Sequence, residues 1–211
     1  MKYPQELAAK VAEASKDMKL EGLLSGAGPI RPMLMIIGEA PGREEIHSHI
    51  PFHGAAGKEL MKSLASIGLK REDVYITSAV RSRPYSVKQV YSKREKAVVT
   101  KRPNRKPTKK EVLAHACLLD YEIQLVKPKV IVTVGTTALE RVLGRQYQIK
   151  SQHGKAVVNT QILQLNKKGD GYEKSHKTYT VIPQYHPAAV FYNRKLEPII
   201  AADWLQVKKY I

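Results

Sequence analysis

The sequence contains a single cysteine, Cys117, among its 211 residues. One thiol can form neither an intrachain disulfide nor a four-cysteine metal site. The chain also contains no apolar run long enough to cross a bilayer, no signal-peptide pattern at its amino terminus and no basic amphipathic helix that would anchor it to an anionic membrane. These absences predict a cytoplasmic protein that does not associate with membranes.

Acidic residues are scarce: 19 Asp and Glu stand against 36 Lys and Arg, which gives a net charge of +17 at pH 7. The rest of the composition, 43% hydrophobic and 26% charged, is ordinary for a globular protein. A positive excess of this size favours a polyanionic partner, and nucleic acid is the commonest one. The length predicts one domain, residues 1–211, with a substantial core.

The most informative stretch is an unbroken apolar run, residues 33–37, that leads directly into a turn containing Gly38, Glu39, Pro41 and Gly42. Five apolar residues without alternation are typical of a strand buried on both faces of a parallel sheet. The two glycines allow close approaches that a Cβ would forbid. Since ligands of open α/β sheets bind beyond the carboxyl ends of such strands, Glu39 is a candidate for chemistry.

Apolar periodicity predicts strands that alternate with helices along the chain. The expected strands after the first cover residues 73–80, 129–134 and 178–182, with a β excursion at 156–163 and a polar loop at 166–177. The expected helices cover residues 3–24, 58–67, 108–126, 138–143 and 198–210. This alternation indicates a three-layer α/β/α domain with a mainly parallel central sheet.

The stretch from residue 81 to residue 110 differs in kind, because it contains 12 Lys and Arg and a single acid, Glu95. Tyr85 and Tyr91 lie among the basic residues. Long excursions within a domain are usually functional or mobile. A solvated, partly disordered loop is one interpretation and contact with a nucleic-acid backbone is the other. The chain-wide positive charge favours the second, and the two are compatible.

Three residues at strand ends are expected to converge on one edge of a parallel sheet: Glu39, Ser78 and His186. A carboxylate and a histidine that face each other across a cleft suit the hydrolysis of a bond whose leaving group departs as an anion. Each residue also has a structural interpretation, since Glu39 could cap its turn through backbone amides and His186, before a proline, could be an ordinary turn residue. From the residues alone the two interpretations have equal weight.

Two other kinds of site are disfavoured. The glycine turn matches neither G-x-G-x-x-G nor the Walker lysine pattern, and an acid there would repel phosphate. His47, His49 and His53 resemble a metal cluster, but Pro51 and Phe52 interrupt it and no second ligand group is evident. A histidine-rich surface loop is the preferred interpretation, and we predict neither a metal nor a cofactor.

Several short motifs, in the right order, resemble the uracil-DNA glycosylase superfamily and most closely its family 4, the thermostable bacterial and archaeal type. They cover residues 38–42, 51–57, 74–77, 83–84, 103–107, 127–131 with Gly135, and 185–189. The resemblance implies a parallel sheet flanked by helices and a DNA repair enzyme. Such a glycosylase of base excision repair would remove uracil or a similar deaminated base from single- or double-stranded DNA, with no cofactor in the chemical step.

The family pattern assigns roles to individual residues. Glu39 takes the place of the acid that serves the attacking water, Phe52 matches the ring that stacks on the flipped base, and His186 matches the histidine that stabilises the uracil anion. Gly38 and Ser78 complete the expected base-binding set. An aromatic face and a donor directed at a base oxygen suit an enzyme that must hold a base outside the DNA stack.

The predicted DNA contacts are basic or apolar residues around this site: Arg81, Arg83, Arg105, Lys106, Phe191 and Arg194. Residues 190–192 follow His186 where the family has a loop that enters the duplex, and apolar side chains can wedge between base steps. Core packing against the terminal helix is an equally weighted alternative for Phe191.

The sequence departs from the family 4 pattern, which includes four cysteines that bind an iron–sulfur cluster. Here the first pair is absent, and Ser82 and His115 stand at the other two positions. Cys117 alone cannot hold a cluster. A basic insertion at about residues 86–102 lies near the missing cluster and is a candidate for its structural or DNA-contacting role. Ser78 replaces a common asparagine, which leaves discrimination between uracil and cytosine open.

The leading hypothesis is therefore a monomeric DNA glycosylase. A DNA-binding protein of the same fold with weak or lost catalysis is the main alternative, motivated by Ser78 and the absent cluster residues. A small-molecule hydrolase would leave the charge of +17 unexplained. Asn104 falls near the position where a related branch has a histidine that bonds covalently to DNA, so we do not predict covalent capture.

Overall fold

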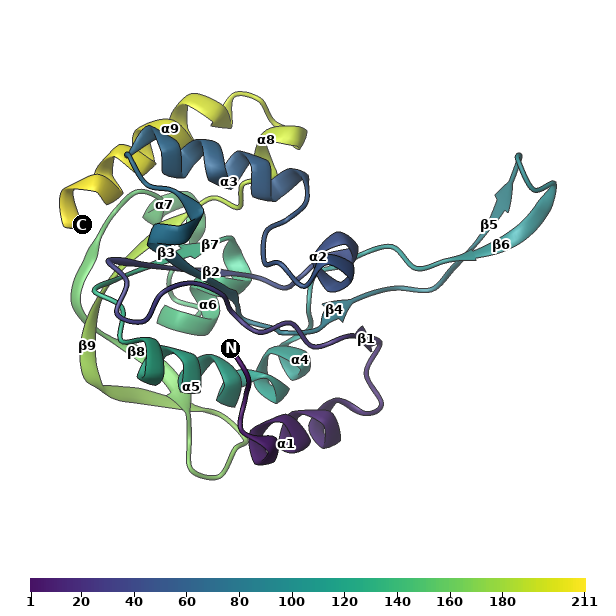
Figure 1. Ribbon diagram of the computed structural model, residues 1–211, viewed down its shortest axis with the longest axis horizontal. Coiled ribbons are helices and arrows are strands. Elements are labelled where there is room, and N and C mark those ends of the chain that lie inside the picture. Colours follow the sequence, from purple (N-terminus) through teal and green to yellow (C-terminus); the bar gives the residue numbers. More distant parts are fainter.

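The central sheet of the computed structural model, which describes residues 1–211, is built around β2 (Leu34–Gly38) (Figure 1). Every residue of β2 is buried, as the unbroken apolar run predicts. β2 pairs in parallel with β3 (Val74–Ser78) on one side and with β7 (Val130–Val134) on the other. β9 (Tyr172–Gln184) pairs in parallel with β7, and β8 (Val157–Leu165) pairs antiparallel to β9. The order β3-β2-β7-β9-β8 confirms the mainly parallel sheet.

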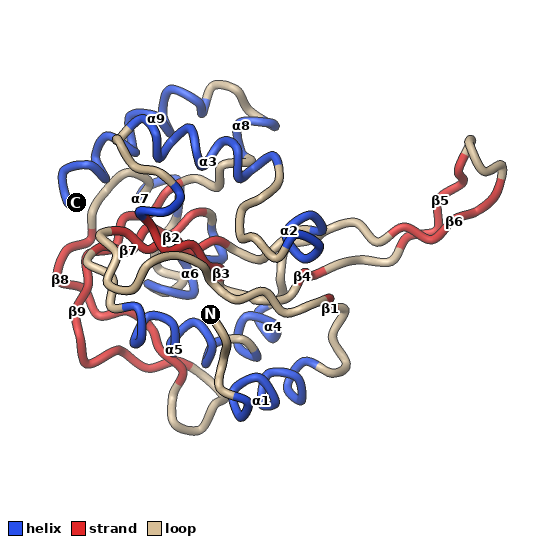
Figure 2. Tube along the Cα trace, in the orientation of Figure 1, coloured by secondary structure: helices blue, strands red, loops and turns tan.

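Helices cover both faces of this sheet (Figure 2). Alternate side chains of β2 point to opposite faces, so the strand contributes to two separate hydrophobic clusters. On one face the cluster includes apolar side chains of α3 (Ala55–Ser66) and α9 (Leu196–Val207). On the other face it includes those of α5 (Ala116–Val126) and α6 (Thr136–Leu143). The three-layer α/β/α architecture is therefore confirmed.

Shorter elements surround these layers. The remaining helices are α1 (Gln5–Ser15), α2 (Arg43–Ser48), α4 (Lys109–Ala114), α7 (Ile149–Gln152), α8 (Ala189–Tyr192), η1 (Arg71–Asp73) and η2 (Lys208–Tyr210). A two-stranded antiparallel sheet joins β1 (Leu20–Glu21) to β4 (Arg83–Pro84). No helix of the structure has the length and apolar character needed to span a membrane.

The basic stretch after β4 forms an antiparallel hairpin of β5 (Lys88–Ser92) and β6 (Ala97–Lys101). The hairpin projects from the body as an arm (Figures 1 and 2). Its ladder runs from Lys88 opposite Lys101 to Ser92 opposite Ala97. The structure thus has a regular two-stranded arm where a partly disordered loop was one interpretation.

Three predicted elements differ from the observed ones. The helix expected at residues 108–126 is divided at His115, whose buried ring accepts a hydrogen bond from the backbone N–H of Arg81 at 3.3 Å. The polar loop expected at 166–177 is strand from Tyr172 onward, because β9 continues its pairing with β8 beyond the sheet core. The first helix is also shorter than expected, since α1 ends at Ser15. The first two differences reflect a tertiary contact and a strand pairing that local periodicity does not report.

Candidate active site

A cleft of about 600 Å³ opens at the carboxyl ends of the parallel strands. Glu39 follows β2, Ser78 is the last residue of β3 and His186 follows β9; all three line the cleft. Phe52, from the loop before α3, also lines it. The remaining wall comes from residues 40–45, from residues 104–107 and from several single side chains, including Leu24, Thr77 and Tyr192. The structure therefore brings together residues that the sequence analysis expected at one edge of the sheet.

Glu39 is held by the first turn of α6. Its Oε1 accepts a hydrogen bond from the backbone N–H of Thr137 at 2.9 Å, whereas no hydrogen bond within the protein engages Oε2. The positive end of the helix dipole favours a negative charge at this point. Gly135 (φ 96°) leaves the necessary room, because a Cβ there would lie 2.6 Å from Oε1. The carboxylate thus caps a distant helix rather than its own turn.

His186 is a neutral hydrogen-bond donor toward the cleft. Its Nδ1 accepts the backbone N–H of Ala188 at 3.2 Å, so a neutral ring has its proton on Nε2. Burial lowers the pKa of His186, and the carboxylates of Glu39 and Glu45 partly oppose that shift. The neutral form is the one that burial favours, and its free Nε2–H is available to a ligand.

Phe52 has its backbone fixed in an uncommon conformation, with φ of 52°. Arg71 donates hydrogen bonds from its two terminal nitrogens to the carbonyls of Pro51 at 2.7 Å and Phe52 at 2.6 Å. The ring centroid lies 5.9 Å from that of His186, with the planes inclined by 31°. Sequence reasoning missed Arg71, because nothing in the local pattern links it to a loop 19 residues earlier.

Gly38 and Ser78 have different relations to the cleft. Gly38 does not line it: a Cβ at this position would lie 2.7 Å from the Phe52 ring, so the glycine makes room for that ring. In this structure Gly38 supports the position of the Phe52 ring, and contact between Gly38 and the base stays a prediction. Ser78 does line the cleft, and its hydroxyl donates to the carbonyl of Val80 at 2.7 Å. The lone pairs of Oγ are what remain for a ligand.

Glu45 ties two of the motifs together and was not singled out from the sequence. Its Oε2 accepts the N–H of Gly42 at 3.0 Å and its Oε1 accepts the N–H of Gly54 at 3.2 Å. One carboxylate thereby fixes the glycine turn relative to the loop that carries Phe52. A glutamate three residues after the N-cap residue Gly42 is one half of a capping box, and this spacing at the start of α2 could have identified Glu45.

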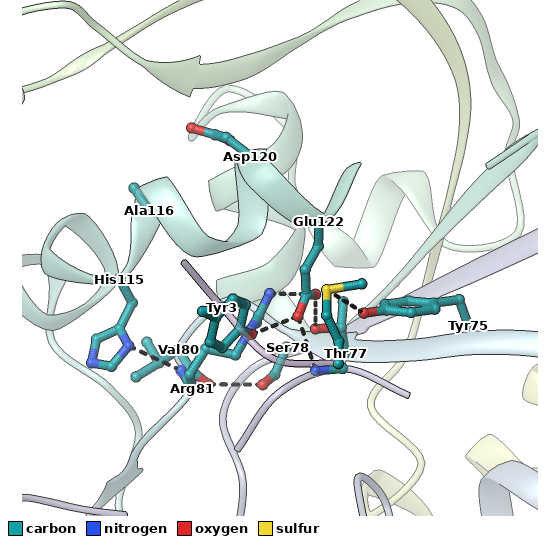
Figure 3. A network of polar contacts seen from close by, with 12 residues as sticks. Tyr3, Tyr75, Thr77, Ser78, Val80, Arg81, His115, Ala116, Asp120 and Glu122 are labelled. Carbon is teal, nitrogen blue, oxygen red and sulfur yellow. Dashed lines mark hydrogen bonds and ion pairs between the residues drawn. The ribbon is translucent and has the colours of Figure 1, made fainter. Parts of the chain in front are cut away.

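Arg81 and Arg83 do not lie on a DNA-accessible surface. Arg81 is 1% exposed and forms an ion pair with Glu122 at 2.8 Å, within a buried polar network (Figure 3). Arg83 is 3% exposed, pairs with Glu21 and donates to Asn104 Oδ1 at 2.6 Å. The prediction that these two residues contact DNA is wrong in this structure, because both guanidinium groups are buried and are bound by acceptors within the protein.

The other predicted DNA contacts lie at the surface to different degrees. Arg105 lines the cleft, but Glu111 binds its guanidinium through two hydrogen bonds of 2.5 and 2.8 Å. Lys106 is exposed on the rim. Phe191, at 53% exposed, does not pack into the core, and Arg194 is exposed beyond it. Three of these side chains are therefore free to meet a ligand, whereas Arg105 has an internal partner.

The positions expected for cluster ligands do not suit an iron–sulfur cluster. Ser82 and His115 are both buried, and burial lowers the pKa of His115 to about 4. Cys117 is the chain's only thiol. No group of three or more His, Cys, Asp or Glu side chains is arranged to hold a metal ion. Because such clusters need several thiolate ligands, these residues do not fit one.

Comparisons with known proteins identify the family. The family model described as the uracil DNA glycosylase superfamily matches residues 25–207. A type-4 uracil-DNA glycosylase of Archaeoglobus fulgidus is 34% identical over 196 residues, covering 86% of this chain and 78% of that protein. One from Sulfurisphaera tokodaii is 31% identical over 87% of this chain and 72% of its own, and one from Thermotoga maritima is 29% identical over 100% and 94%. The chain belongs to the uracil DNA glycosylase superfamily.

Proposed function

We propose that this chain is a DNA glycosylase that flips uracil, or a similar deaminated base, out of DNA and hydrolyses its N-glycosidic bond. The observation that carries this function is the presence of Glu39 and His186 on one cleft, with the Phe52 ring beside His186. The names of the type-4 relatives point to the same substrate.

The flipped base would lie against Phe52. Extrusion of a nucleotide costs a few kcal/mol of lost stacking and pairing, and an aromatic face recovers part of that energy. Arg71 supports this role, since it binds the carbonyls of Pro51 and Phe52 and so restricts the backbone that carries the ring. Ser78 Oγ offers lone pairs, which suit the N3–H donor of uracil.

Cleavage of the bond leaves an electron pair on the departing base and positive charge on the sugar. The Nε2–H of neutral His186 donates to a carbonyl oxygen of the base and stabilises the anion. Glu39, anchored through Oε1, uses Oε2 to orient a water molecule and to stabilise the cationic sugar. The water oxygen bonds to C1′ as one of its protons passes to the carboxylate, and the base leaves as an anion. The base anion then takes up a proton from solvent and Glu39 returns its proton to solvent, so the products are a neutral free base and an abasic site.

Contact with DNA would come from the rim of the cleft and from the net charge of +17. Lys106 lines the cleft and is exposed, and Arg194 is exposed two residues after Tyr192, which also lines the cleft, so both are available to phosphates. Exposed Phe191, next to Tyr192, is suited to fill the gap that the flipped base leaves. We further propose that residues 1–211 act as one domain, with residues 86–102 as an insertion, and that the protein works as a cytoplasmic monomer. Light scattering in solution tests the oligomeric state.

The experiment is excision from uracil-containing single- and double-stranded oligonucleotides, followed by alkaline cleavage at abasic sites. The Glu39→Gln and His186→Gln variants should each lose most of the rate. Glu44→Gln is the matched control, because Glu44 also lines the cleft but its carboxylate accepts no hydrogen bond there. If the wild-type protein releases no uracil, hypoxanthine or xanthine, the proposed activity is wrong.

A second candidate function is DNA binding without efficient catalysis. It is favoured by two departures from the family pattern, Ser78 in the cleft and the absence of residues that fit an iron–sulfur cluster. Salt-sensitive binding of uracil-containing DNA without base release would support this alternative over the first.

A further inference from the structure

The β5–β6 hairpin is separated from the rest of the molecule. None of its residues belongs to either hydrophobic cluster, and nearly all of them are exposed. Figure 1 shows it extending from the body like an arm. An isolated two-stranded hairpin is only marginally stable in water, so a surface that such an arm can lie against would stabilise it.

The charge of the arm is almost entirely positive. Its basic residues are Lys88, Lys93, Arg94, Lys96, Lys101 and Arg102, against the single acid Glu95. No ion pair within the protein involves any of them. The Arg102 guanidinium lies over the Tyr85 ring, 5.1 Å from its centroid, and the other five cations have no charged partner within the protein. Cations without an internal counter-charge are available to an external polyanion.

The arm also exposes an apolar pair. Tyr91 is opposite Val98 in the ladder, so the two side chains lie on the same face. Their exposed fractions are 62% and 65%. This face carries no charge in the ladder, since the neighbouring pair is Gln89 with Thr100. An uncovered aromatic and aliphatic pair beside cations suits a partner with both phosphates and apolar edges.

The base of the arm is tied to the rim of the cleft. The N–H of Ser86 donates to Pro103 at 3.0 Å, and Tyr85 forms a bridge with Asn104. Arg83, which is buried, donates to Asn104 and to the carbonyl of Arg102. Because Asn104 lines the cleft, this clamp fixes where the arm leaves the body relative to the site.

We infer that the arm binds the major groove of double-stranded DNA beside the flipped nucleotide. Five residues per strand at about 3.4 Å each give a reach of roughly 17 Å, near half a turn of B-DNA. The major groove, about 12 Å wide, admits a two-stranded ribbon. The basic side chains contact the flanking phosphates, and the Tyr91–Val98 face is directed at base edges and thymine methyl groups. The location beside the flipped base rests on the function proposed above.

The test compares two matched variants of the full chain. One replaces Lys88, Lys93, Lys96 and Lys101 by Gln. The control replaces four exposed lysines of the other hairpin and its loop, β8–β9, by Gln: Lys167, Lys168, Lys174 and Lys177. Both lose the same charge without altering either core. Binding to duplex DNA without uracil is measured over a salt series, together with excision from single-stranded uracil DNA.

The arm variant should bind duplex at least tenfold more weakly, and its slope of log K against log salt should be shallower by about 2 to 4, at about 0.9 for each lost phosphate contact. The control should change affinity by no more than about twofold, and both variants should excise single-stranded uracil at nearly the wild-type rate. An equal loss of duplex affinity in the two variants, or no loss of duplex affinity in the arm variant, would overturn the inference. Competition by a minor-groove ligand such as netropsin, but not by a major-groove ligand, would overturn the groove assignment.

These measurements separate the two proposals. If the wild-type protein excises no base, the glycosylase function fails, whereas the salt slopes on uracil-free duplex still decide whether the arm binds DNA. A Tyr91→Ser variant, which keeps every charge, should weaken duplex binding by a few fold without changing the salt slope. An unchanged affinity for that variant would exclude the apolar face from the contact.

Discussion

Two glutamates of this chain, Glu39 and Glu122, have opposite surroundings. Each accepts a backbone N–H at 2.9 Å, from Thr137 and Gly26 respectively. Glu39 makes no other side-chain hydrogen bond and lines an open cleft. Glu122 is fully buried, and its two oxygens together accept four hydrogen bonds. A carboxylate with an unused oxygen at a cleft can act on a ligand, whereas one whose oxygens are all engaged can only hold the fold together.

The Glu122 network replaces solvation in the interior. Arg81 donates to Glu122 at 2.8 Å and to the Tyr3 hydroxyl at 2.7 Å, and Tyr3 donates in turn to Glu122. Burial raises the pKa of Tyr3, so its hydroxyl stays protonated. A buried pair of this kind is costly to break from one side, because the remaining charge has no partner. The network also ties the amino terminus to α5 and to the end of β3, where Thr77 joins it (Figure 3).

Replacing Glu39 by Gln should produce the largest effect on activity. The amide keeps an oxygen for the Thr137 N–H but has no negative charge to orient water or stabilise the sugar. We expect the excision rate to fall by about 10³-fold, roughly 4 kcal/mol of transition-state free energy. Single-turnover excision measures this, with DNA affinity and melting temperature unchanged. A loss below tenfold would contradict the assignment of Glu39 to the chemical step.

Replacing Glu122 by Gln should lower stability and leave the excision rate nearly unchanged, the opposite of the effect expected at Glu39. Arg81 would remain buried with an uncharged partner, so the free energy of unfolding should fall by about 3 kcal/mol. Excision per folded molecule should stay within a few fold. Urea unfolding provides the measurement. An Arg81→Met/Glu122→Gln double variant should be more stable than the Glu122→Gln variant, because it leaves no buried charge without a partner. If the stability losses of the Arg81→Met and Glu122→Gln variants simply add in the double variant, the two residues are not coupled.

Acid should destabilise the protein through His115. Burial lowers its pKa from 6.5 to about 4, so between these values the unfolded chain binds a proton that the folded chain does not. The contribution of His115 is therefore complete above pH 6.5 and declines as the pH falls toward 4, by about 3 kcal/mol in total. Urea unfolding at several pH values measures the slope. His115→Gln should flatten it, whereas His53→Gln, at an exposed position, should leave it unchanged.

The smallest change that tests the role of the Glu39 carboxylate is one added methyl group beside it, in a Gly135→Ala variant. Gly135 and Gly144 flank α6 with nearly the same backbone angles, φ 96° and ψ 168° against φ 101° and ψ 167°. An alanine at Gly135 would meet the Glu39 carboxylate, whereas one at Gly144 would meet the exposed, flexible Gln146 side chain. Both variants should lose about 1–2 kcal/mol of stability from backbone strain.

Only the Gly135→Ala variant should also lose activity. We expect its excision rate to fall by about tenfold, or about 1.4 kcal/mol, because the carboxylate must shift. Excision assays on both variants at a temperature where each is folded make the comparison. Equal activity in the two would show that the position of Glu39 tolerates displacement.

Much of the fold could be predicted from the sequence, because buried strands and helices have characteristic patterns of apolar residues. The unbroken apolar run of β2 indicates a strand covered on both faces, and strands alternating with helices indicate a parallel sheet. The convergence of Glu39, Ser78 and His186 follows from that topology, since parallel strands end at the same edge. The motifs around these residues resemble those of the uracil-DNA glycosylase superfamily, and the match of the family model to residues 25–207 confirms it.

The wrong predictions at Arg81 and Arg83 and the omission of Arg71 have a common physical origin. Arg81 and Arg83 were predicted to contact DNA because they are basic residues near the expected site, but each has acceptors supplied from distant segments. Glu122 lies 41 residues from Arg81, and no local pattern links them. Arg71 was missed for the same reason, since its partners are carbonyl groups, which every residue possesses.

The sequence by itself determined the architecture, the family and the residues that meet at the cleft, because hydrophobic periodicity and strand direction are local properties whose consequences are regular. The tertiary structure alone decided which charges are inside. It pairs Arg81 with Glu122, leaves one oxygen of Glu39 free and turns a basic stretch into an arm beside the cleft. Such outcomes depend on which distant acceptors reach each donor, and that is settled only when the chain has folded.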